Sequence, residues 1–460
     1  MPVTESPSVT LAPGKPLILL GAFDIGDVGY VAEEFFISGT ARSVTPGDAA
    51  DYTTRMVVLT PDDPARFNGT VLVEWLNVSG GIDAPAVWMM AHREVVRSGY
   101  AYVAVSVQRV GVEGGASMLA ADMSLKRQDP ARYGALHHPG DGYAYDIFTQ
   151  AGETLKYAER HGISRLSRAR SVIAVGESQS AMFLTTYINA VDPLAQTFDG
   201  FLVHSRFGSA APLDGSSIFA ESGAAQPVPF RPDLRVPVMT VITETDLFGA
   251  AREGYYFARQ PDNDRLRVWE IPGAAHADNY TIQVAPIDSG TARVDDLAAA
   301  YAPTNVLMGQ RLSHYINFAP QHHYVLQAAL DALNAWVRTG APPPEAPPLD
   351  VTDSGQPMPV LDANGLALGG VRTPWVDVPI ARTSGFGGDD SVMSAIFGSG
   401  EPFDAATLNR LYPDGAAEYL ARFGAALDAA IQAGFILPAD REEILALAAA
   451  TYRRGESSQA

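Results

Sequence analysis

The chain has 460 residues, of which 47% are hydrophobic and 18% charged, so it carries ample apolar material for a large core and is not a disordered chain. Its formal net charge of -20 disfavours nucleic acid and anionic membrane surfaces as partners, because phosphate groups are bound through lysine and arginine. The chain has no cysteine, which excludes disulfide bonds, thiolate metal sites and a cysteine nucleophile.

The N-terminal segment MPVTESPSVTLAPGKP lacks a basic region followed by an apolar run. No uncharged apolar run of about 18 residues, the length that a membrane-spanning helix needs, occurs in the sequence. We therefore expect a soluble protein without membrane insertion, which is cytoplasmic unless a signal peptide has been removed. The sequence indicates no oligomeric state.

Residues 9–60 contain alternating apolar and polar positions separated by glycine and proline, which predicts antiparallel strands. The predicted strands lie in VTLAPG, PLILLGAF, VGYVAEEFFISGTARSV and DYTTRMVVLTP. Residues 69–78 are almost continuously apolar, as in a strand that is buried on both faces. A helix is expected over residues 86–98, and a second buried strand over residues 101–108.

Residues 109–144 are rich in glycine, proline and histidine and predict no regular element. Residues 145–162 have helical spacing, and SVIAVG predicts a third buried strand that is followed by a helix from Ser178 to about Ala190. Further strands are predicted in FDGFLVHS, VPVMTVITETD and RLRVWEIPGAAH. Strands that alternate with helices predict an α/β fold with a mostly parallel central sheet and helices on both faces.

Two irregular segments, residues 206–235 and 277–320, interrupt this pattern and are interpreted as insertions. The amphipathic stretch HHYVLQAALDALNAWVRTG closes the unit, and the proline-rich segment APPPEAPPLD follows it. We therefore predict a core over residues 1–340. Residues 341–460 would form a Pro/Gly-rich segment and a helical C-terminal extension packed on that core.

The stretch VGESQSA places Ser178 between a buried strand and a helix. Small residues on both sides of a serine allow a turn tight enough to expose its Oγ atom, as in the G-x-S-x-G nucleophile elbow. Here the second small position is Ser180 instead of glycine. A structural alternative is that Gly176 ends the strand and Ser178 caps the helix.

An acid and a histidine follow Ser178 in the order that would serve it. Asp246 and Glu244 lie in TETD after one predicted strand, and His276 lies in PGAAHAD after the next. A serine nucleophile needs a general base that a carboxylate orients. Asp246 is favoured as this carboxylate because it is the fourth residue of TETD, and Glu244 is the alternative acid. The structural alternative for His276 is a hydrogen bond to a backbone carbonyl.

An oxyanion hole would complete this set of residues, and it needs two backbone N–H groups. Gln179, the residue after the serine, would supply one. The loop LNVSGG would supply the other through Asn77, Val78 or Ser79, although an ordinary turn would also contain its glycines.

The adjacent pairs His137–His138 and His322–His323 do not have metal-ligand spacing. No H-E-x-x-H, EF-hand or P-loop pattern occurs. We therefore expect neither a metal nor a cofactor.

Taken together, these segments resemble the α/β-hydrolase superfamily, and more closely a bacterial group of α/β-hydrolase-domain proteins of about this length. The resemblance covers most of residues 27–450. It rests on VLVEWLNVSGG, DPARYGALHHPGDGYAYDIFTQAG, VGESQSA, VPVMTVITETD, RVWEIPGAAHAD, GGVRTPWVDVP and LYPDGAAEYLARF. It implies an α/β-hydrolase fold and a serine esterase of the carboxylesterase type, with Ser178 as nucleophile, His276 as base and Asp246 as orienting acid.

The resemblance implies a small-molecule ester as substrate, without naming it. The segment HHPGDGYAYD would lie near the carboxyl edge of the sheet, where sites of open α/β sheets form. The candidate substrate-binding residues are therefore His137, His138, Asp141 and Tyr143, for which hydrogen bonding within the loop is the alternative role. The insertions, together with the C-terminal region, would form a cap over the site, in which Phe219, Phe230, Tyr301 and Phe318 hint at a hydrophobic ester or belong to plain packing.

Other functions use the same residues or the same fold. Acyl transfer and the hydrolysis of amides or lactones need the same triad. A binding protein with an inert site is the alternative from another class, and the intact order of Ser, Asp and His counts against it. A dinucleotide-binding oxidoreductase is disfavoured because no G-x-G-x-x-G follows the first buried strand.

Overall fold

The computed structural model describes residues 6–118, 121–218, 226–250, 252–353, 355–388 and 391–459. The chain divides into two compact units. Unit 1 comprises Met1–Met239, Asn263–Leu266 and Leu333–Ala341, and unit 2 comprises Thr240–Asp262, Arg267–Ala332 and Pro342–Ala460. The sequence predicts a different division, into a core over residues 1–340 and an extension over residues 341–460. That division stays a prediction.

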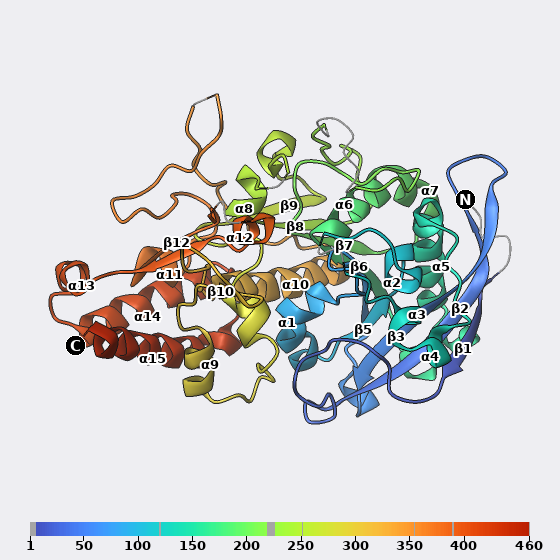
Figure 1. The fold of residues 1–460 in the computed structure, drawn as a ribbon, viewed down its shortest axis with the longest axis horizontal. Coiled ribbons are helices and arrows are strands. Elements are labelled where there is room, and N and C mark those ends of the chain that lie inside the picture. The colour runs from blue at the N-terminus through green and yellow to red at the C-terminus, as the bar shows by residue number, and fades with distance from the viewer. Residues whose placement is uncertain are drawn as a thin grey trace. The chain divides into compact units, whose positions relative to one another are not determined.

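Unit 1 is built on a sheet with the strand order β1-β2-β3-β5-β4-β6-β7 (Figure 1). Its N-terminal strands pair antiparallel, as the alternating runs predict, and the later strands pair parallel, as the apolar runs predict. Strands β3 and β5 are antiparallel and join the two parts. The strands are β1 (Ser8–Ala12), β2 (Tyr30–Arg42), β3 (Ala49–Pro61), β4 (Thr70–Trp75), β5 (Ala101–Val105), β6 (Ser171–Glu177) and β7 (Gly200–His204).

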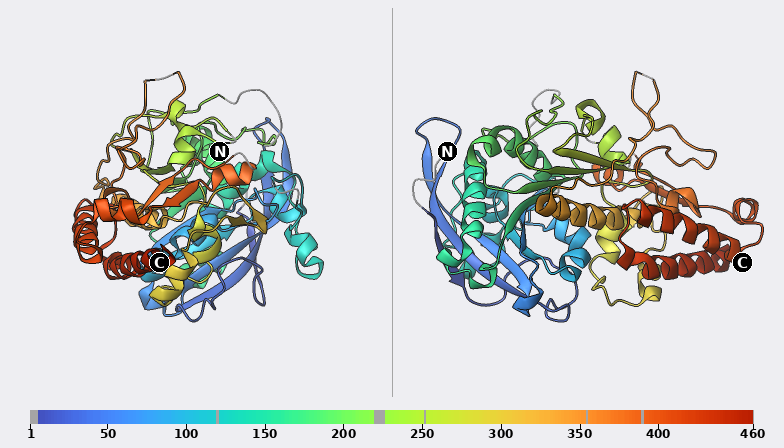
Figure 2. Two further views of the ribbon diagram at one scale, coloured as in Figure 1. Left: turned by 60° about the vertical axis from the view of Figure 1, so that its left-hand side comes forward. Right: turned by 180° about the vertical axis from the view of Figure 1, so that it is seen from behind.

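Helices cover both faces of the parallel strands because neighbouring residues of a strand point to opposite sides. The ring of Trp75 in β4 lies 4.9 Å from that of Phe148 in α5 (Ala144–Lys156) and 5.1 Å from that of Phe183 in α6 (Gln179–Thr186). The preceding residue, Glu74, accepts hydrogen bonds from the first backbone N–H groups of α1 (Ala86–Arg97). Strand β4 therefore meets α5 and α6 on one face and α1 on the other (Figure 1 and Figure 2).

The strand predicted in PLILLGAF is wrong: the structure gives residues 16–23 no strand. Side chains satisfy the backbone groups of this segment instead of a neighbouring strand. The N–H of Leu17 donates to the Tyr133 hydroxyl at 3.1 Å, and the carbonyl of Leu17 accepts from Arg55. The indole N–H of Trp88 donates to the carbonyl of Leu20 at 2.9 Å. At these three backbone groups, side chains take the place that a neighbouring strand would have.

Residues 109–144, for which the composition predicts no regular element, contain short helices. Asp129 starts one of them, since its carboxylate accepts from the N–H of Arg132 while Pro130 occupies the first turn. The short helices are α2 (Arg109–Glu113), α3 (Leu125–Gln128) and α4 (Pro130–Tyr133), and α7 (Asp192–Ala195) follows later in unit 1.

Most of strands β8 (Val238–Thr243) and β9 (Leu266–Ile271) belongs to unit 2, as does the first part of helix α10 (Gln321–Thr339). The C-terminal helices pack through Tyr419, Phe423 and Leu427 of α14 (Ala416–Gln432) and Ile444 and Ala448 of α15 (Arg441–Gln459). The other α-helices and strands described in unit 2 are α8 (Glu244–Phe248), α9 (Val294–Ala300), β10 (Val306–Leu307), β11 (Gln310–Arg311), α11 (Pro374–Asp377), β12 (Ala381–Ser384), α12 (Val392–Ile396), β13 (Ser399–Pro402) and α13 (Ala405–Leu411).

Among the residues that the structure describes, no helix combines the length and the apolar character that crossing a membrane requires.

Candidate active site

Ser178 lies between the end of β6 and the start of α6, in a conformation that serine rarely adopts. Its φ is 56° and its ψ is -114°, which is a strained region for any residue with a Cβ atom. Its N–H donates to the carbonyl of His204 at the end of β7, at 2.9 Å. The side chain is half-buried and makes no capping hydrogen bond to α6. The structural alternative, a serine that caps the helix, is therefore not what the described residues show.

Gly176 explains how the turn accommodates a serine at its second small position. A Cβ atom on Gly176 would lie 2.9 Å from Cδ1 of Leu184 and 3.2 Å from Cβ of Ser180. The first distance is too short for a real Cβ, so only glycine fits here without a shift of its neighbours. Gly176 thus leaves room for the side chain that Ser180 has and a glycine would lack.

The candidate oxyanion donors of the loop after β4 are all hydrogen-bonded within unit 1. The N–H of Asn77 donates to the carbonyl of Ala84, and that of Ser79 donates to Oδ1 of Asn77. The N–H of Val78 donates to the side-chain Oε1 of Gln179 at 3.2 Å. Val78 and Ser79 donate to side chains, which can rotate away, whereas Asn77 donates to a backbone carbonyl. The hydrogen bond of Val78 is the longer of the two to a side chain, at 3.2 Å against 2.8 Å. The N–H of Gln179 lies in the first turn of α6, where the helix itself offers no acceptor.

A chain of side chains connects Gln179 to the histidine-rich segment. Nε2 of Gln179 donates to Oε1 of Gln108 at 2.6 Å, and Nε2 of Gln108 donates to Oδ2 of Asp141 at 3.2 Å. The buried His138 places its Nε2 atom 2.7 Å from the carbonyl oxygen of Val107, and burial lowers the pKa of this histidine. Asp141 and His138 therefore support the segment that holds the side chain of Gln179.

The remaining candidate substrate-binding residues have other surroundings. The side chain of His137 is exposed, and its backbone pairs with Thr53. The hydroxyl of Tyr143 donates to Oδ1 of Asp48 at 2.8 Å. The substrate-binding role of His137, His138, Asp141 and Tyr143 stays a prediction.

His276 and Asp246 form a buried pair in unit 2. Nδ1 of His276 lies 2.6 Å from Oδ1 of Asp246. Asp246 is held by a capping box at the start of α8, in which the N–H and the hydroxyl of Thr243 donate to Oδ2 of Asp246 at 2.9 and 2.7 Å. The N–H of His276 donates to Oγ1 of Thr245 at 3.1 Å, and that hydroxyl donates to the carbonyl of Gly385. Both members of the pair are therefore anchored by the same short helix.

Glu244, the alternative acid, binds backbone groups. Its Oε1 atom accepts from the N–H of Gly273, in the loop after β9, and its Oε2 atom accepts from the N–H of Gly385 and the hydroxyl of Ser384. Burial raises its pKa to about 7, although these hydrogen bonds act in the opposite direction. Glu244 thus ties the histidine loop to strand β12, and Asp246 is the carboxylate that bonds to the His276 ring.

Of the three predicted triad residues, the structure brings Asp246 and His276 together in unit 2, and Ser178 is described in unit 1. Sequence reasoning did not find the supporting roles of Gln108, Thr243 and Thr245. The pattern T-E-T-D contains a signal for Thr243, because a threonine three residues before an acid is typical of a capping box. No comparable local signal marks Gln108.

The aromatic residues expected in the cap lie in different places. The guanidinium of Arg206 lies 4.9 Å from the ring centre of Phe230 in unit 1. Tyr301 and Phe318 line a cavity in unit 2. Phe219 lies outside the described residues. Within the described ranges, no group of three or more His, Cys, Asp or Glu side chains is arranged to hold a metal ion.

Comparison with known proteins identifies one family. The family described as Alpha/beta hydrolase domain matches residues 2–446, which confirms the fold expected from the sequence. No curated protein matches the chain significantly.

Three solved structures illustrate the range of similar proteins, and all are distant. A proposed dienelactone hydrolase from Klebsiella pneumoniae subsp. pneumoniae is 13% identical, with a TM-score of 0.32 over 58% of this chain and 95% of that chain. A glucuronoyl esterase from Solibacter usitatus is 11% identical, with a TM-score of 0.31 over 59% and 82% of the two chains. An esterase from Pyrococcus furiosus is 10% identical, with a TM-score of 0.30 over 55% and 87%.

Proposed function

Because this chain belongs to the alpha/beta hydrolase domain family, we propose that it is a serine-dependent carboxylic-ester hydrolase that acts through an acyl-enzyme. The observation that supports this most is the hydrogen bond between Nδ1 of His276 and Oδ1 of Asp246. When Nδ1–H donates to a carboxylate, the lone pair of the neutral imidazole is on Nε2, the nitrogen that a general base uses. The strained backbone of Ser178, between a strand and a helix, is what a nucleophile elbow requires.

In this mechanism, Oγ of Ser178 attacks the carbonyl carbon of the ester, and Nε2 of His276 accepts the hydroxyl proton. The tetrahedral intermediate then collapses, the bond to the alcohol oxygen breaks, and the leaving alcohol takes the proton from His276. Asp246 keeps the imidazole in the correct tautomer and stabilises its charged form. Water repeats the sequence on the acyl-enzyme and releases the acid.

The oxyanion would accept hydrogen bonds from the backbone N–H groups of Gln179 and Val78. In the structure, Oε1 of Gln179 accepts from the N–H of Val78. It therefore occupies the place where we expect the substrate oxygen to bind. The side chain of Gln179 would therefore rotate away when substrate enters. This rotation would also change the hydrogen bond from Nε2 of Gln179 to Gln108, which Asp141 orients.

A panel of p-nitrophenyl acyl esters and a fluorophosphonate label test this proposal. We expect turnover by the wild type, its loss in Ser178→Ala, and peptide mass mapping that places the label on Ser178. Ser180→Ala is the matched control, because it removes the neighbouring buried hydroxyl and should keep both turnover and labelling. A folded wild type that neither turns over any ester nor takes the label would favour an inert binding protein.

A further inference from the structure

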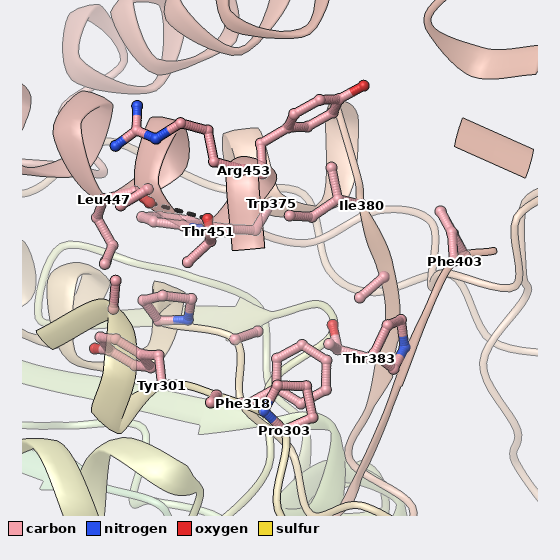
Figure 3. A pocket seen from close by; sticks show the side chains of 18 of the residues that line it. Tyr301, Pro303, Phe318, Trp375, Ile380, Thr383, Phe403, Leu447, Thr451 and Arg453 are labelled. Atoms are coloured by element: carbon pink, nitrogen blue, oxygen red, sulfur yellow. Dashed lines mark hydrogen bonds between the residues drawn. The ribbon is translucent and has the colours of Figure 1, made fainter. Parts of the chain in front are cut away.

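Unit 2 contains a cavity with a volume of about 820 Å³ (Figure 3). Its walls come from α9, α11, α13, α14, α15, β12 and the end of β13, and from the loops after α9 and α11, before α10 and after β13. Aromatic side chains from these segments dominate the lining, and they are Tyr301, Phe318, Trp375, Phe403, Tyr419 and Tyr452.

The size of the cavity indicates a binding site more than an imperfection of packing. Protein interiors contain few voids larger than a water molecule, whereas sites for small molecules enclose about 300–1,000 Å³ and are lined mainly by apolar and aromatic groups. Ring contacts hold the walls in place, because Tyr419 stacks on Tyr452 at 4.7 Å and Trp375 stacks on Tyr324 at 5.6 Å. These walls keep the space open without a ligand.

The two charged residues of the lining are exposed. They are the acidic Asp295 and the basic Arg453. The rest of the lining is aromatic and aliphatic, with two threonines. An ionised group that entered this interior would lose its water without gaining a partner of opposite charge. The part of a ligand that fills the cavity is therefore uncharged and largely apolar.

Thr383 supplies a polar group without a hydrogen-bond partner. Its side chain extends from β12 toward the space bordered by Phe318 and Trp375 (Figure 3), and its residue is only 5% exposed. Among the described residues, its hydroxyl has no partner, whereas the hydroxyl of Thr451 donates to the carbonyl of Leu447 at 2.9 Å. A buried hydroxyl without a partner is unfavourable. In the structure the hydroxyl oxygen itself is covered and lies beside Gly273, where a Cβ atom would be 2.8 Å from it. A rotation about χ1 would turn it into the cavity, where an oxygen atom of a ligand would provide the partner.

The cavity is distinct from the Asp246–His276 pair. The hydroxyl of Ser384, next to Thr383 in β12, donates to Glu244, so alternation along the strand turns Thr383 to the opposite side. The lining does not include Thr243, Thr245 or Gly385, which hold Asp246, His276 and their helix.

We propose that this cavity binds a neutral, largely apolar small molecule that carries a carbonyl or hydroxyl oxygen, and that Thr383 donates a hydrogen bond to this oxygen. The site is additional to the ester-hydrolysing residues and does not depend on the proposed function.

Titration with prodan, a neutral naphthalene fluorophore that carries one ketone oxygen, tests the site. We expect saturable binding with a blue-shifted emission. Thr383→Val should weaken binding about two- to tenfold, as the loss of one hydrogen bond predicts, and Thr383→Ser should retain the affinity. Ala450→Phe and Ala298→Leu each place a larger side chain at the wall of the cavity and should weaken binding.

Folding is measured separately, by thermal unfolding without the probe. Thr383→Val should be at least as stable as the wild type, because it replaces an unpaired buried hydroxyl with a methyl group of similar size. Prodan binding should persist in Ser178→Ala and after fluorophosphonate treatment. The proposal is wrong if the folded wild type shows no saturable binding, if Thr383→Val binds as tightly as the wild type, or if both filled variants bind as tightly as the wild type. Loss of binding after fluorophosphonate treatment would place the probe at the nucleophile and would also overturn the proposal.

Discussion

Nδ1 of His276 lies 2.6 Å from Oδ1 of Asp246, and the other carboxylate oxygen of Asp246 accepts two hydrogen bonds from Thr243. Each carboxylate oxygen of Asp246 thus faces a hydrogen-bond donor. In an asparagine, the NH₂ group would replace one of these oxygens and would face a donor instead of accepting from it. Asp246→Asn should keep the fold but favour the wrong tautomer of His276. We expect kcat for p-nitrophenyl acetate to fall by about 10³- to 10⁴-fold, measured under saturating substrate.

Glu244→Gln is the matched control for this comparison, because Glu244 bonds to backbone groups in the structure. Its kcat should stay within about tenfold of the wild type at a temperature where the variant is folded. If Glu244→Gln instead caused the larger loss, the orienting role would belong to Glu244.

The backbone of Ser178 stores strain that glycine would relieve. Residues with a Cβ atom are disfavoured at a φ of 56° with a ψ of -114°, at a cost of about 1–3 kcal/mol. Part of the gain from glycine is offset by the larger entropy of its unfolded chain. Ser178→Gly should therefore exceed Ser178→Ala in free energy of unfolding by about 1 kcal/mol, measured by urea denaturation. Equal stabilities would show that the turn is unstrained.

Gly176 should be intolerant of even one added methyl group. The Cβ of Gly176→Ala would lie 2.9 Å from Leu184 and press on Ser180, so the strand and the helix around Ser178 must move apart. Such overpacking costs about 1–3 kcal/mol. Gly355→Ala is the control, since a Cβ there has no neighbour within 4 Å. If urea denaturation gave the two variants the same stability, Gly176 would have no packing role.

The strands around the candidate site could be predicted because their signal is local. Strands β4 and β6 are mostly apolar runs, and a serine between small residues follows β6 directly. The segment PLILLGAF has the same local pattern but forms no strand, because its partners Arg55, Trp88 and Tyr133 are distant in the sequence. A pattern of apolar residues does not reveal which distant side chains will form hydrogen bonds with the backbone N–H and C=O groups of a segment.

In the candidate site, too, features that depend on local sequence could be predicted, whereas features that depend on distant partners could not. The order of Ser178, Asp246 and His276 is visible in the sequence. The partner of Glu244, Gly385, is 141 residues away, so the sequence alone left both acids open. Two residues of the cavity, Tyr301 and Phe318, were candidates for contact with a hydrophobic ester. The cavity as a whole was not predicted, because its lining extends from Asp295 to Arg453 and only packing brings these segments together.

Glu244 should make the stability of the protein depend on pH. Its pKa is raised from an ordinary value of 4.5 to about 7 in the folded protein, because the buried site disfavours the ionised form. Between these two values the folded protein binds more protons than the unfolded chain does. The contribution of Glu244 to stability is therefore fully present below pH 4.5 and is lost as the pH rises toward 7, by on the order of 3 kcal/mol.

Glu244→Gln cannot titrate, so it isolates this contribution from those of all other groups. Gln also lacks one of the two acceptors that Gly273 and Gly385 use, which lowers stability by an amount that does not vary with pH. The free energy of unfolding of the wild type minus that of Glu244→Gln should therefore decrease from pH 4.5 to pH 7 and level off above it. Urea denaturation of both proteins across this range measures the difference, and a constant difference would mean that Glu244 does not change its protonation when the protein folds.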